Sequence, residues 1–407
     1  MKEKILAYTT ILLIFSLFFG ILLWVNFTIV PHLPDGESFL VPWIGARSFL
    51  VEQTNPYTLD AARETQIAIY GHPAGDGEYP YRLDIPFYIL SFYFPFGLIE
   101  NYDLARALWM SFAEIALFVV GFLSIYLSEW KTSRTNKIIY FLALFISFYG
   151  LYPLIEGSGA IFSALTLLLI LVATRNGWDS FLGLLLAFGV LRWQIGGLLF
   201  LLVIFWLVKS RKWRVFGILT MSLTALIGTS FVLVPKWFTP FASSIVANAR
   251  GAQGFLFSEI IQIWNPANSI LIANIIKWIL LLILFLEWRA ARDRDFQQFF
   301  WVASLSLAIT PFLNIHITPI FYSILFFPLA LVFKIAEDRW SRQAKWGIPL
   351  VAISILFSWG LFNRASHGLQ LLTFLLPLLL FIALYWLRWW YISPPRTWVD
   401  EISRNYK

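Results

Sequence analysis

The chain contains no cysteine, and charged residues make up only 13% of its 407 positions. The lack of cysteine excludes disulfides, thiolate metal sites and cysteine nucleophiles. Soluble proteins carry roughly 25% charged residues, so this chain has too little polar surface to coat a water-soluble particle of its length. The sequence also lacks a phosphate-binding P-loop, a His-Glu-x-x-His zinc motif and a nucleophile elbow.

Apolar and aromatic side chains are abundant instead, at 59% and 19% of the residues. Tryptophan and tyrosine collect at the boundary between lipid and water, so this aromatic share is typical of a chain that crosses a bilayer many times. The composition predicts an all-α polytopic membrane protein. Its net charge of +7 is interpreted as a signal of orientation in the membrane, and no nucleic-acid partner is expected.

Long apolar stretches predict the membrane spans. Ile5–Phe27 carries no charge and is long enough to cross about 30 Å of hydrocarbon. No small-residue cleavage site follows it, so we expect a retained helix rather than a signal peptide. Further spans are predicted at Ala105–Leu127, Ile138–Ile155, Ala160–Ala173, Phe181–Leu191, Ile195–Val208, Val215–Val234, Ser269–Leu286, Phe299–Leu313, Ile317–Phe333, Gly347–Phe362 and Leu369–Trp386.

These spans give a single integral membrane domain over residues 1–407, a bundle of about 12–13 transmembrane helices. The higher number applies if Ile85–Ile99 crosses the bilayer; we expect it to dip in from the outer face as a half-helix. Some predicted spans are short, notably Phe181–Leu191. Short helices persist in a membrane only when they pack against protein or line a wet cavity.

The distribution of charge predicts which side of the membrane each loop faces. Four basic clusters, at 209–214, 289–294, 334–345 and in the tail 388–407, are expected in the cytoplasm by the positive-inside rule. The first loop, 31–82, holds seven acids and three arginines, so it is expected outside, and alternation places a flap loop at 235–267 outside as well. We therefore predict a multi-pass protein of the cell membrane with both termini in the cytoplasm.

Within the first external loop, Ser38–Val51 and Thr58–Tyr70 are predicted as helices that lie at the membrane interface. The turn Asn55-Pro56-Tyr57 separates them.

The sequence Asp35-Gly36-Glu37 directly follows the first span and places two carboxylates one residue apart. They could share a divalent cation such as Mg or Mn, or one of them could act as a general base. Proximity to the bilayer is expected to desolvate the acid partly and to raise its pKa. The structural alternative is a helix cap, in which Asp35 starts the next helix and Glu37 interacts favourably with the helix dipole. The two interpretations are compatible.

Cationic and polar residues recur at other positions predicted on the outer face. Arginine can clamp a phosphate through paired donors, and histidine can donate to an anionic oxygen. Each residue also has a structural alternative: a snorkelling or turn arginine, or a structural histidine. The candidates are Arg82 with Asp84, Arg192 with Gln194, His316 with Asn314, Arg250 in the flap loop, and the carboxylate of Glu156.

Several short motifs together resemble the GT-C superfamily of polyprenyl-phosphate-sugar-dependent glycosyltransferases, and most closely bacterial glycosyltransferase family 87. The family pattern of an aspartate after the first helix, an aromatic and alanine stretch and a Pro-Tyr is similar to the set Asp35, Phe39, Trp43, Ala46 and Pro56-Tyr57. Its later elements are similar to Tyr79-Pro80, Arg192-Trp193-Gln194 and the set Asn314, His316 and Pro319. The chain departs from the family at Arg192, where lysine is usual, and at Glu156-Gly157-Ser158, where Gly-Gln and Asn are usual.

The resemblance implies a GT-C-like bundle and an inverting transfer of a sugar, a hexose such as mannose, from a polyprenyl-phosphate donor. The acceptor would be a glycan, glycolipid or protein on the extracytoplasmic side. Asp35 would be the general base, while Arg82, Arg192 and His316 would bind the donor phosphate. Supporting or substrate-binding roles would fall to Glu37, Tyr57, Tyr79, Asp84, Glu156, Gln194, Arg250 and Asn314. Three alternatives remain open: a transporter or flippase for a lipid-linked sugar, a polymerase or ligase of surface polysaccharide, and an inactive or scaffolding relative, which the departures at Arg192 and Glu156 allow.

Overall fold

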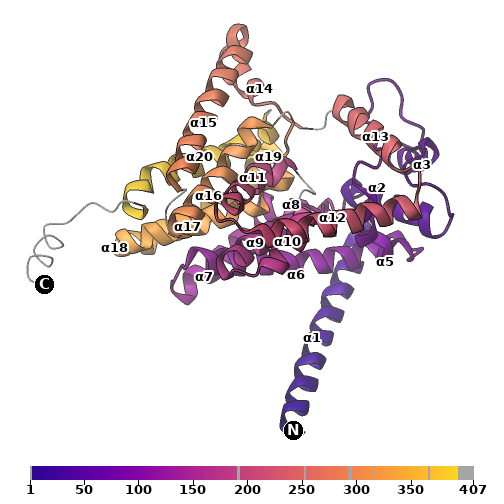
Figure 1. Cartoon of the computed structure of the whole chain (residues 1–407), viewed down its shortest axis with the longest axis horizontal. Helices are drawn as coiled ribbons and strands as arrows, with labels where there is room; N and C mark the ends of the chain where they lie inside the picture. The colour runs from indigo at the N-terminus through magenta and orange to yellow at the C-terminus, as the bar shows by residue number, and fades with distance from the viewer. Residues whose placement is uncertain are drawn as a thin grey trace, which may run out of the picture. The chain divides into compact units, whose positions relative to one another are not determined.

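The chain is helical almost throughout the computed structural model, which describes residues 2–189, 193–251, 254–291, 296–314, 316–364 and 367–392 (Figure 1). Within these ranges there is no strand, and the one isolated bridge joins Phe255 to Ile317. The predicted all-α fold is therefore confirmed. Of the predicted tail 388–407, the part after Ile392 lies outside the described residues, as do Arg292 and Arg294.

The helices follow one another with short connections. The first part of the chain forms α1 (Lys2–Ile29), α2 (Glu37–Leu50), α3 (Leu59–Tyr70), α4 (Phe87–Leu90), α5 (Phe94–Gly97), α6 (Tyr102–Ser128), α7 (Arg134–Ile146), α8 (Phe148–Ile155), α9 (Ala160–Asn176) and α10 (Asp179–Gly189). The second part forms α11 (Trp193–Lys209), α12 (Trp213–Leu233), α13 (Phe238–Gly251), α14 (Phe257–Gln262), α15 (Ser269–Ala291), α16 (Phe296–Leu313), α17 (Phe326–Arg339), α18 (Ser341–Leu356), α19 (Ser358–Arg364) and α20 (Gly368–Tyr391).

Eight of the described helical segments are long and apolar enough to cross a membrane, so the protein is a multi-pass membrane protein. α7 and α8 add a ninth span only if they are taken together, because their axes bend by 43° at Ser147. Four shorter apolar segments occupy other predicted positions: Phe87–Gly97, Ala160–Asn176, Asp179–Gly189 and Gly196–Lys209. The predicted count of 12–13 is reached only if these short helices are included.

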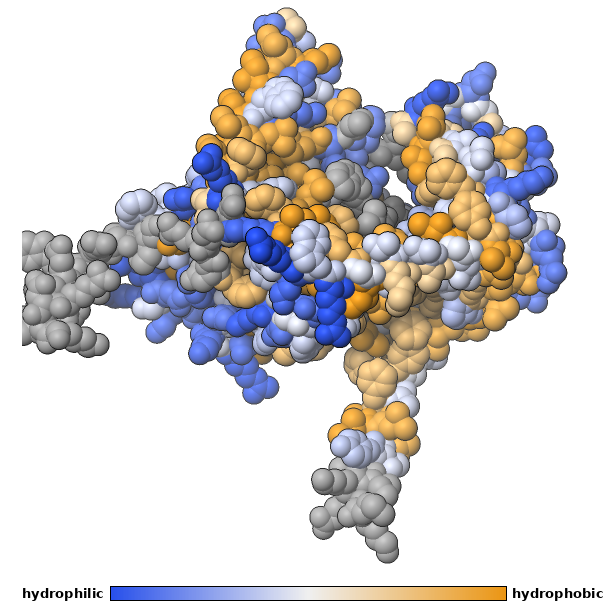
Figure 2. Space-filling view, viewed as in Figure 1, coloured by the Kyte–Doolittle hydropathy of each residue, from blue (hydrophilic) through white to orange (hydrophobic). Residues whose placement is uncertain are grey.

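Several of the long apolar helices, among them α1 and α15, carry apolar side chains on their exposed surfaces. On α15, Trp278 is 72% exposed and Phe285 62% exposed, and Figure 2 shows apolar residues over this helix. In α1, only 11% of the most apolar window is buried. Exposing such apolar surface to water costs free energy, whereas exposing it to hydrocarbon does not. These helices therefore contact the lipid bilayer.

The chain forms two compact units, each assembled from separate stretches of sequence. Unit 1 comprises Met1–Phe118, Tyr152–Phe162 and Met221–Gln253. Unit 2 comprises Val119–Leu151, Ser163–Thr220 and Gly254–Lys407.

An aromatic core organises unit 1 around α2. Phe39 is fully buried, and its ring lies 5.3 Å from that of Trp109 and 6.0 Å from those of Phe96 and Tyr102. The indole N–H of Trp43 donates to the carbonyl of Phe96 at 2.9 Å. These contacts hold the broken segment α4–α5 against α2, where the sequence predicted a half-helix.

Both predicted interfacial helices of the first loop are present, as α2 and α3. Thr58 caps α3 by accepting the backbone N–H of Ala61, in agreement with the preference of N-caps for small hydroxyl residues. The segment 235–267, predicted as an external flap loop, contains helices that the sequence analysis did not predict. Most of this segment is helical, as α13 in unit 1 and α14 in unit 2.

The core of unit 2 is α16, which packs against α11, α15, α17 and α20. Nearly every residue of α16 is buried, including Trp301. Small side chains such as Ala303, Ser304 and Ala308 let the neighbouring backbones approach closely, which is the usual basis of helix packing in membranes. α16 therefore meets protein on all sides.

Candidate functional site

The turn Asp35-Gly36-Glu37 leads from the end of the first span into α2. Gly36 is the N-cap of α2 with φ 68° and ψ 50°, a left-handed conformation that favours glycine. A Cβ atom at this position would lie 2.6 Å from the guanidinium carbon of Arg106. Both the backbone conformation and the available space therefore require glycine between the two carboxylates.

The helix-cap interpretation of Asp35 is wrong, because Gly36 is the N-cap and no side chain bonds to the first turn. Glu37, in contrast, lies in the first turn of α2, where a negative charge interacts favourably with the helix dipole. Asp35 is exposed, so the protein itself does not bury this carboxylate.

Tyrosine hydroxyls hold the turn on both sides. The hydroxyl of Tyr102 donates to the backbone carbonyl of Asp35 at 2.5 Å, and the hydroxyl of Tyr81 donates to the carboxylate of Glu37. The backbone of Asp35 is thus fixed while its carboxylate stays open to solvent. This is the arrangement that a base acting on an incoming substrate requires.

Arg106, in the first turns of α6, is a central residue that the sequence analysis missed. It is 2% exposed, and its guanidinium donates to the carbonyl of Ile155 at 2.6 Å. Its Nε has no hydrogen-bond partner among the described residues. The signal was present in the sequence, because an arginine inside a predicted span is costly and marks a candidate functional site.

Glu156 is a half-buried acid of this region and lies just past the end of α8. Burial raises the pKa of the Glu156 carboxyl, and the nearby charge of Glu37 raises it further. A hydrogen bond from Tyr152 and the charge of Arg106 act in the opposite direction. The conditions expected at Asp35 are thus met at Glu156.

The turn that carries Glu156 rests on the same aromatic core as α2. Gly157 has φ 62°, and a Cβ there would lie 2.6 Å from the Cβ of Phe39. The indole N–H of Trp109 donates to the carbonyl of Gly157 at 2.8 Å. The turns at Gly36 and Gly157 therefore pack against the same aromatic core. We call the residues at these two turns, with their hydrogen-bonding and charged neighbours, the Arg106 cluster. It comprises Asp35, Gly36, Glu37, Tyr81, Tyr102, Arg106, Tyr152 and Glu156.

Arg82 lies in unit 1 and is anchored through its backbone. Its N–H donates to the side-chain oxygen of Asn248 at 3.2 Å, and the amide of Asn248 donates to its carbonyl at 2.7 Å. Within the described ranges, its guanidinium has no carboxylate within ion-pair distance. The charge remains available to a ligand. Arg250, on the same helix as Asn248, is exposed.

Tyr57 and Tyr79 have structural contacts. The hydroxyl of Tyr57 donates to the carbonyl of Ile85 at 2.7 Å. Burial, and then the charge of Asp84, raise the pKa of Tyr57 well above its usual range. The N–H of Tyr79 donates to the hydroxyl of Tyr70 at 3.1 Å. Asp84 itself is exposed.

The remaining predicted residues belong to unit 2. The amide of Asn314 donates to the carbonyl of Gln194 at 2.6 Å, which joins two of the predicted motifs. Nδ1 of His316 is buried and has no hydrogen-bond partner among the described residues. Arg192 lies outside the described residues.

The described residues contain no group of three or more His, Asp or Glu side chains placed to hold a metal ion. A cation shared by Asp35 and Glu37 would thus gain no third ligand of these types from the described part of the chain. What the Arg106 cluster does offer is an exposed carboxylate on a fixed turn, next to a half-buried acid and a buried arginine.

Fold and site together define the class: an all-helical, multi-pass membrane protein that concentrates ionisable groups at the junction of its first span and the following helix. No protein family, no curated protein and no solved structure matches the chain.

Proposed function

We propose that the protein is an inverting membrane glycosyltransferase of the GT-C type. It would move a sugar, a hexose such as mannose, from a polyprenyl-phosphate donor to an acceptor hydroxyl at the extracytoplasmic face of the cell membrane. The observation that carries this proposal is the exposed carboxylate of Asp35 on a turn that Tyr102 and Gly36 fix in place. The acceptor is a glycan, a glycolipid or a protein.

In the proposed reaction, Asp35 takes the proton of the acceptor hydroxyl as that oxygen attacks the anomeric carbon. The bond between this carbon and the donor phosphate breaks, and the electron pair leaves with polyprenyl phosphate. A single displacement of this kind inverts the configuration at the anomeric carbon. Arg82 is proposed to bind the phosphate and to stabilise the charge that accumulates on it. The family resemblance assigns the same role to Arg192 and His316.

Arg106 is proposed as a positioning residue and not as a phosphate ligand. Its guanidinium is buried, donates to Ile155 and lies against Gly36. It therefore links the turn of Asp35 to the turn of Glu156. Its charge also favours the ionised form of Glu156, against the effect of burial.

The proposal is tested with purified protein in nanodiscs and a panel of polyprenyl-phosphate sugars, with release of free polyprenyl phosphate as the readout. Asp35→Asn is expected to reduce transfer by about 10²–10⁴-fold, the usual contribution of a general base. Asp60→Asn is the matched control, because Asp60 is an exposed acid of the same loop and pairs only with Arg63 among the described residues. Undiminished transfer by Asp35→Asn, or an equal loss in Asp60→Asn, contradicts the assignment.

One observation favours a second candidate function, a flippase for lipid-linked sugars. Glu114 lies midway along α6, a candidate span, and accepts a hydrogen bond from Asn26 at 3.1 Å. Acids at mid-span often belong to transport pathways. If this candidate is right, Glu114→Gln reduces translocation of the lipid-linked sugar in proteoliposomes, and the wild type leaves the sugar–phosphate bond intact.

A further inference from the structure

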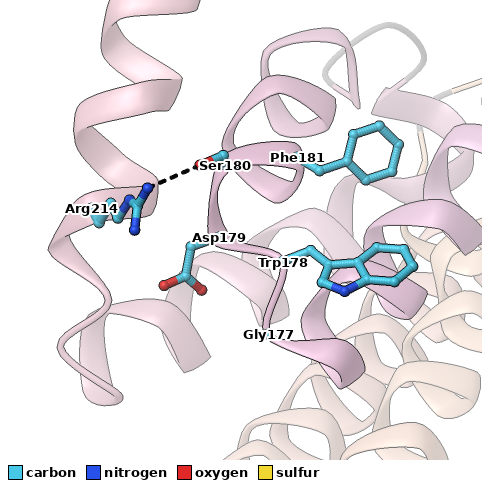
Figure 3. A pocket seen from close by; sticks show the side chains of 6 residues that line it. All are labelled: Gly177, Trp178, Asp179, Ser180, Phe181 and Arg214. Atoms are coloured by element: carbon cyan, nitrogen blue, oxygen red, sulfur yellow. Dashed lines mark hydrogen bonds between the residues drawn. The ribbon is translucent and has the colours of Figure 1, made fainter.

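A pocket of about 350 Å³ lies where α9 turns into α10, in unit 2. Gly177, with φ 66°, makes the turn after α9, and α10 begins two residues later. In Figure 3, Arg214 at the start of α12 faces Ser180 and Asp179, while Trp178 and Phe181 extend on the other side of the turn. These five side chains and Gly177 line the pocket.

Close packing of two helices fixes the walls of this pocket. A Cβ atom on Gly183 of α10 would lie 2.8 Å from the Cβ of Ile218 and 2.9 Å from the carbonyl oxygen of Val215, both in α12. The two backbones therefore touch one turn away from Ser180 and Arg214. A pocket with such walls is formed before any ligand binds.

The charge in the pocket is positive and incompletely compensated. Lys212 pairs with Asp179 at 3.2 Å, so these two charges offset each other. Arg214 is exposed, and among the described residues its hydrogen-bond partner is the neutral hydroxyl of Ser180 at 3.4 Å. The guanidinium thus keeps its donors and its charge available for an anion.

Exposed aromatic rings lie on the helix ends and the turn that form the pocket. Trp178 is 52% exposed, Phe181 is 39% exposed, and Trp213, next to Arg214, is 63% exposed. Such rings at the ends of apolar helices settle at the boundary between lipid and water. The pocket therefore combines an arginine available to an anion with apolar rings of the kind that settle at the boundary between lipid and water.

We propose that this pocket binds an anionic phospholipid, with Arg214 on the headgroup phosphate and the rings of Trp178 and Phe181 against the glycerol and the first part of the acyl chains. Basic pockets between membrane helices are known to take anionic headgroups. A zwitterionic lipid brings its own positive charge and does not compensate that of Arg214. The lipid is neither donor nor acceptor of the proposed sugar transfer, so this proposal stands or fails independently.

The test is native mass spectrometry of the delipidated protein with phosphatidylglycerol or phosphatidylcholine of identical chains. We expect preferential retention of phosphatidylglycerol, and a several-fold loss of this preference in Arg214→Gln. Arg134→Gln is the matched control. Arg134 is also exposed and begins α7, and this substitution removes the same charge. Equal effects of the two variants, or retention of both lipids alike, would overturn the proposal.

Two further measurements separate the phosphate from the lipid. Arg214→Lys keeps the positive charge but lacks the planar guanidinium. We therefore expect its retention of phosphatidylglycerol to lie between that of the wild type and that of Arg214→Gln. Trp178→Ala is expected to weaken binding of phosphatidylglycerol, since it removes the apolar contact. Glycerol 1-phosphate, which has no acyl chains, is expected to compete poorly even at high concentration. If it displaces the lipid at equal concentration, the site recognises a soluble phosphate and the lipid assignment is wrong.

Discussion

The two units use buried charge in opposite ways. In unit 2, Glu287 of α15 is 7% exposed and accepts two hydrogen bonds from Arg388 of α20, at 2.9 and 3.2 Å. The guanidinium of Arg388 also lies over the ring of Trp301, 5.6 Å from its centre. This pair is complete, because each charge has its counter-charge in fork geometry.

In unit 1 the charges are close but not paired in this way. Arg106 donates to a backbone carbonyl, while Glu37 and Glu156 receive hydrogen bonds from tyrosines. Among the described residues, no cation lies within ion-pair distance of either acid. The difference indicates that unit 2 uses its pair to join helices, whereas unit 1 gathers ionisable groups without pairing them, a feature that functional sites often share.

The largest effect is expected from breaking the complete pair. Arg388→Met leaves the carboxylate of Glu287 buried without a partner, which typically costs about 3–5 kcal/mol of folding free energy. We expect the lower end of this range, since the side chain of Arg388 is 30% exposed. Thermal unfolding in detergent measures the change.

The double variant Glu287→Leu with Arg388→Met is the control for this prediction. Replacement of a whole buried pair by apolar residues is often neutral or stabilising. The double variant is therefore expected to recover most of the stability lost in Arg388→Met. A double variant as unstable as the single one would show that the pair is not the cause.

The second prediction concerns the glycine beside Arg106. Gly36→Ala and Gly71→Ala both place a side chain on a left-handed backbone, with φ of 68° and 77°. A Cβ at Gly71 meets nothing within 4 Å, whereas at Gly36 it would meet the buried guanidinium of Arg106. Because Arg106 can move only by losing its bond to Ile155, Gly36→Ala is expected to cost at least about 1 kcal/mol more than Gly71→Ala. Equal losses of stability in the two variants would contradict this prediction, because they would mean that the side chain of Arg106 moves away from the new Cβ atom without loss of free energy.

The smallest effect is a dependence of stability on pH. The folded protein raises the pKa of Glu156, so it binds this proton more tightly than the unfolded chain does. The contribution of Glu156 is therefore fully present below the ordinary glutamate pKa and is lost as the pH rises through the raised value. Melting temperatures of the wild type are expected to fall, relative to Glu156→Gln, over this range. Glu100→Gln, at an exposed position, should follow the wild type; parallel wild-type and Glu156→Gln curves contradict the prediction.

Sequence patterns predicted the elements that depend on local chemistry. α2 and α3 appear where the first loop was expected to be helical, because Asn55-Pro56-Tyr57 forms the turn and Thr58 supplies a cap. The helices within the predicted flap loop were not foreseen. That loop was assigned by alternation of predicted spans, which gives no information on structure within a loop, whereas α13 is stabilised by contacts such as Asn248 with Arg82.

The Arg106 cluster shows where local patterns give too little information. Asp35, Glu37 and Glu156 were all candidates, but the expected desolvation was assigned to Asp35 and not to Glu156. Burial depends on what packs against a residue. Phe39 and Trp109, distant in sequence, bury the turn at Gly157 and leave Asp35 open.

The sequence by itself determined that the protein is helical and embedded in a membrane, because apolar length and scarce charge are properties of each segment alone. Only the tertiary structure decided which ionisable groups are neutralised, as in Glu287 with Arg388, and which are not, as in Glu37 and Glu156. The reason is that desolvation and Coulomb interaction depend on distances between segments far apart in the chain, and no single segment records those distances.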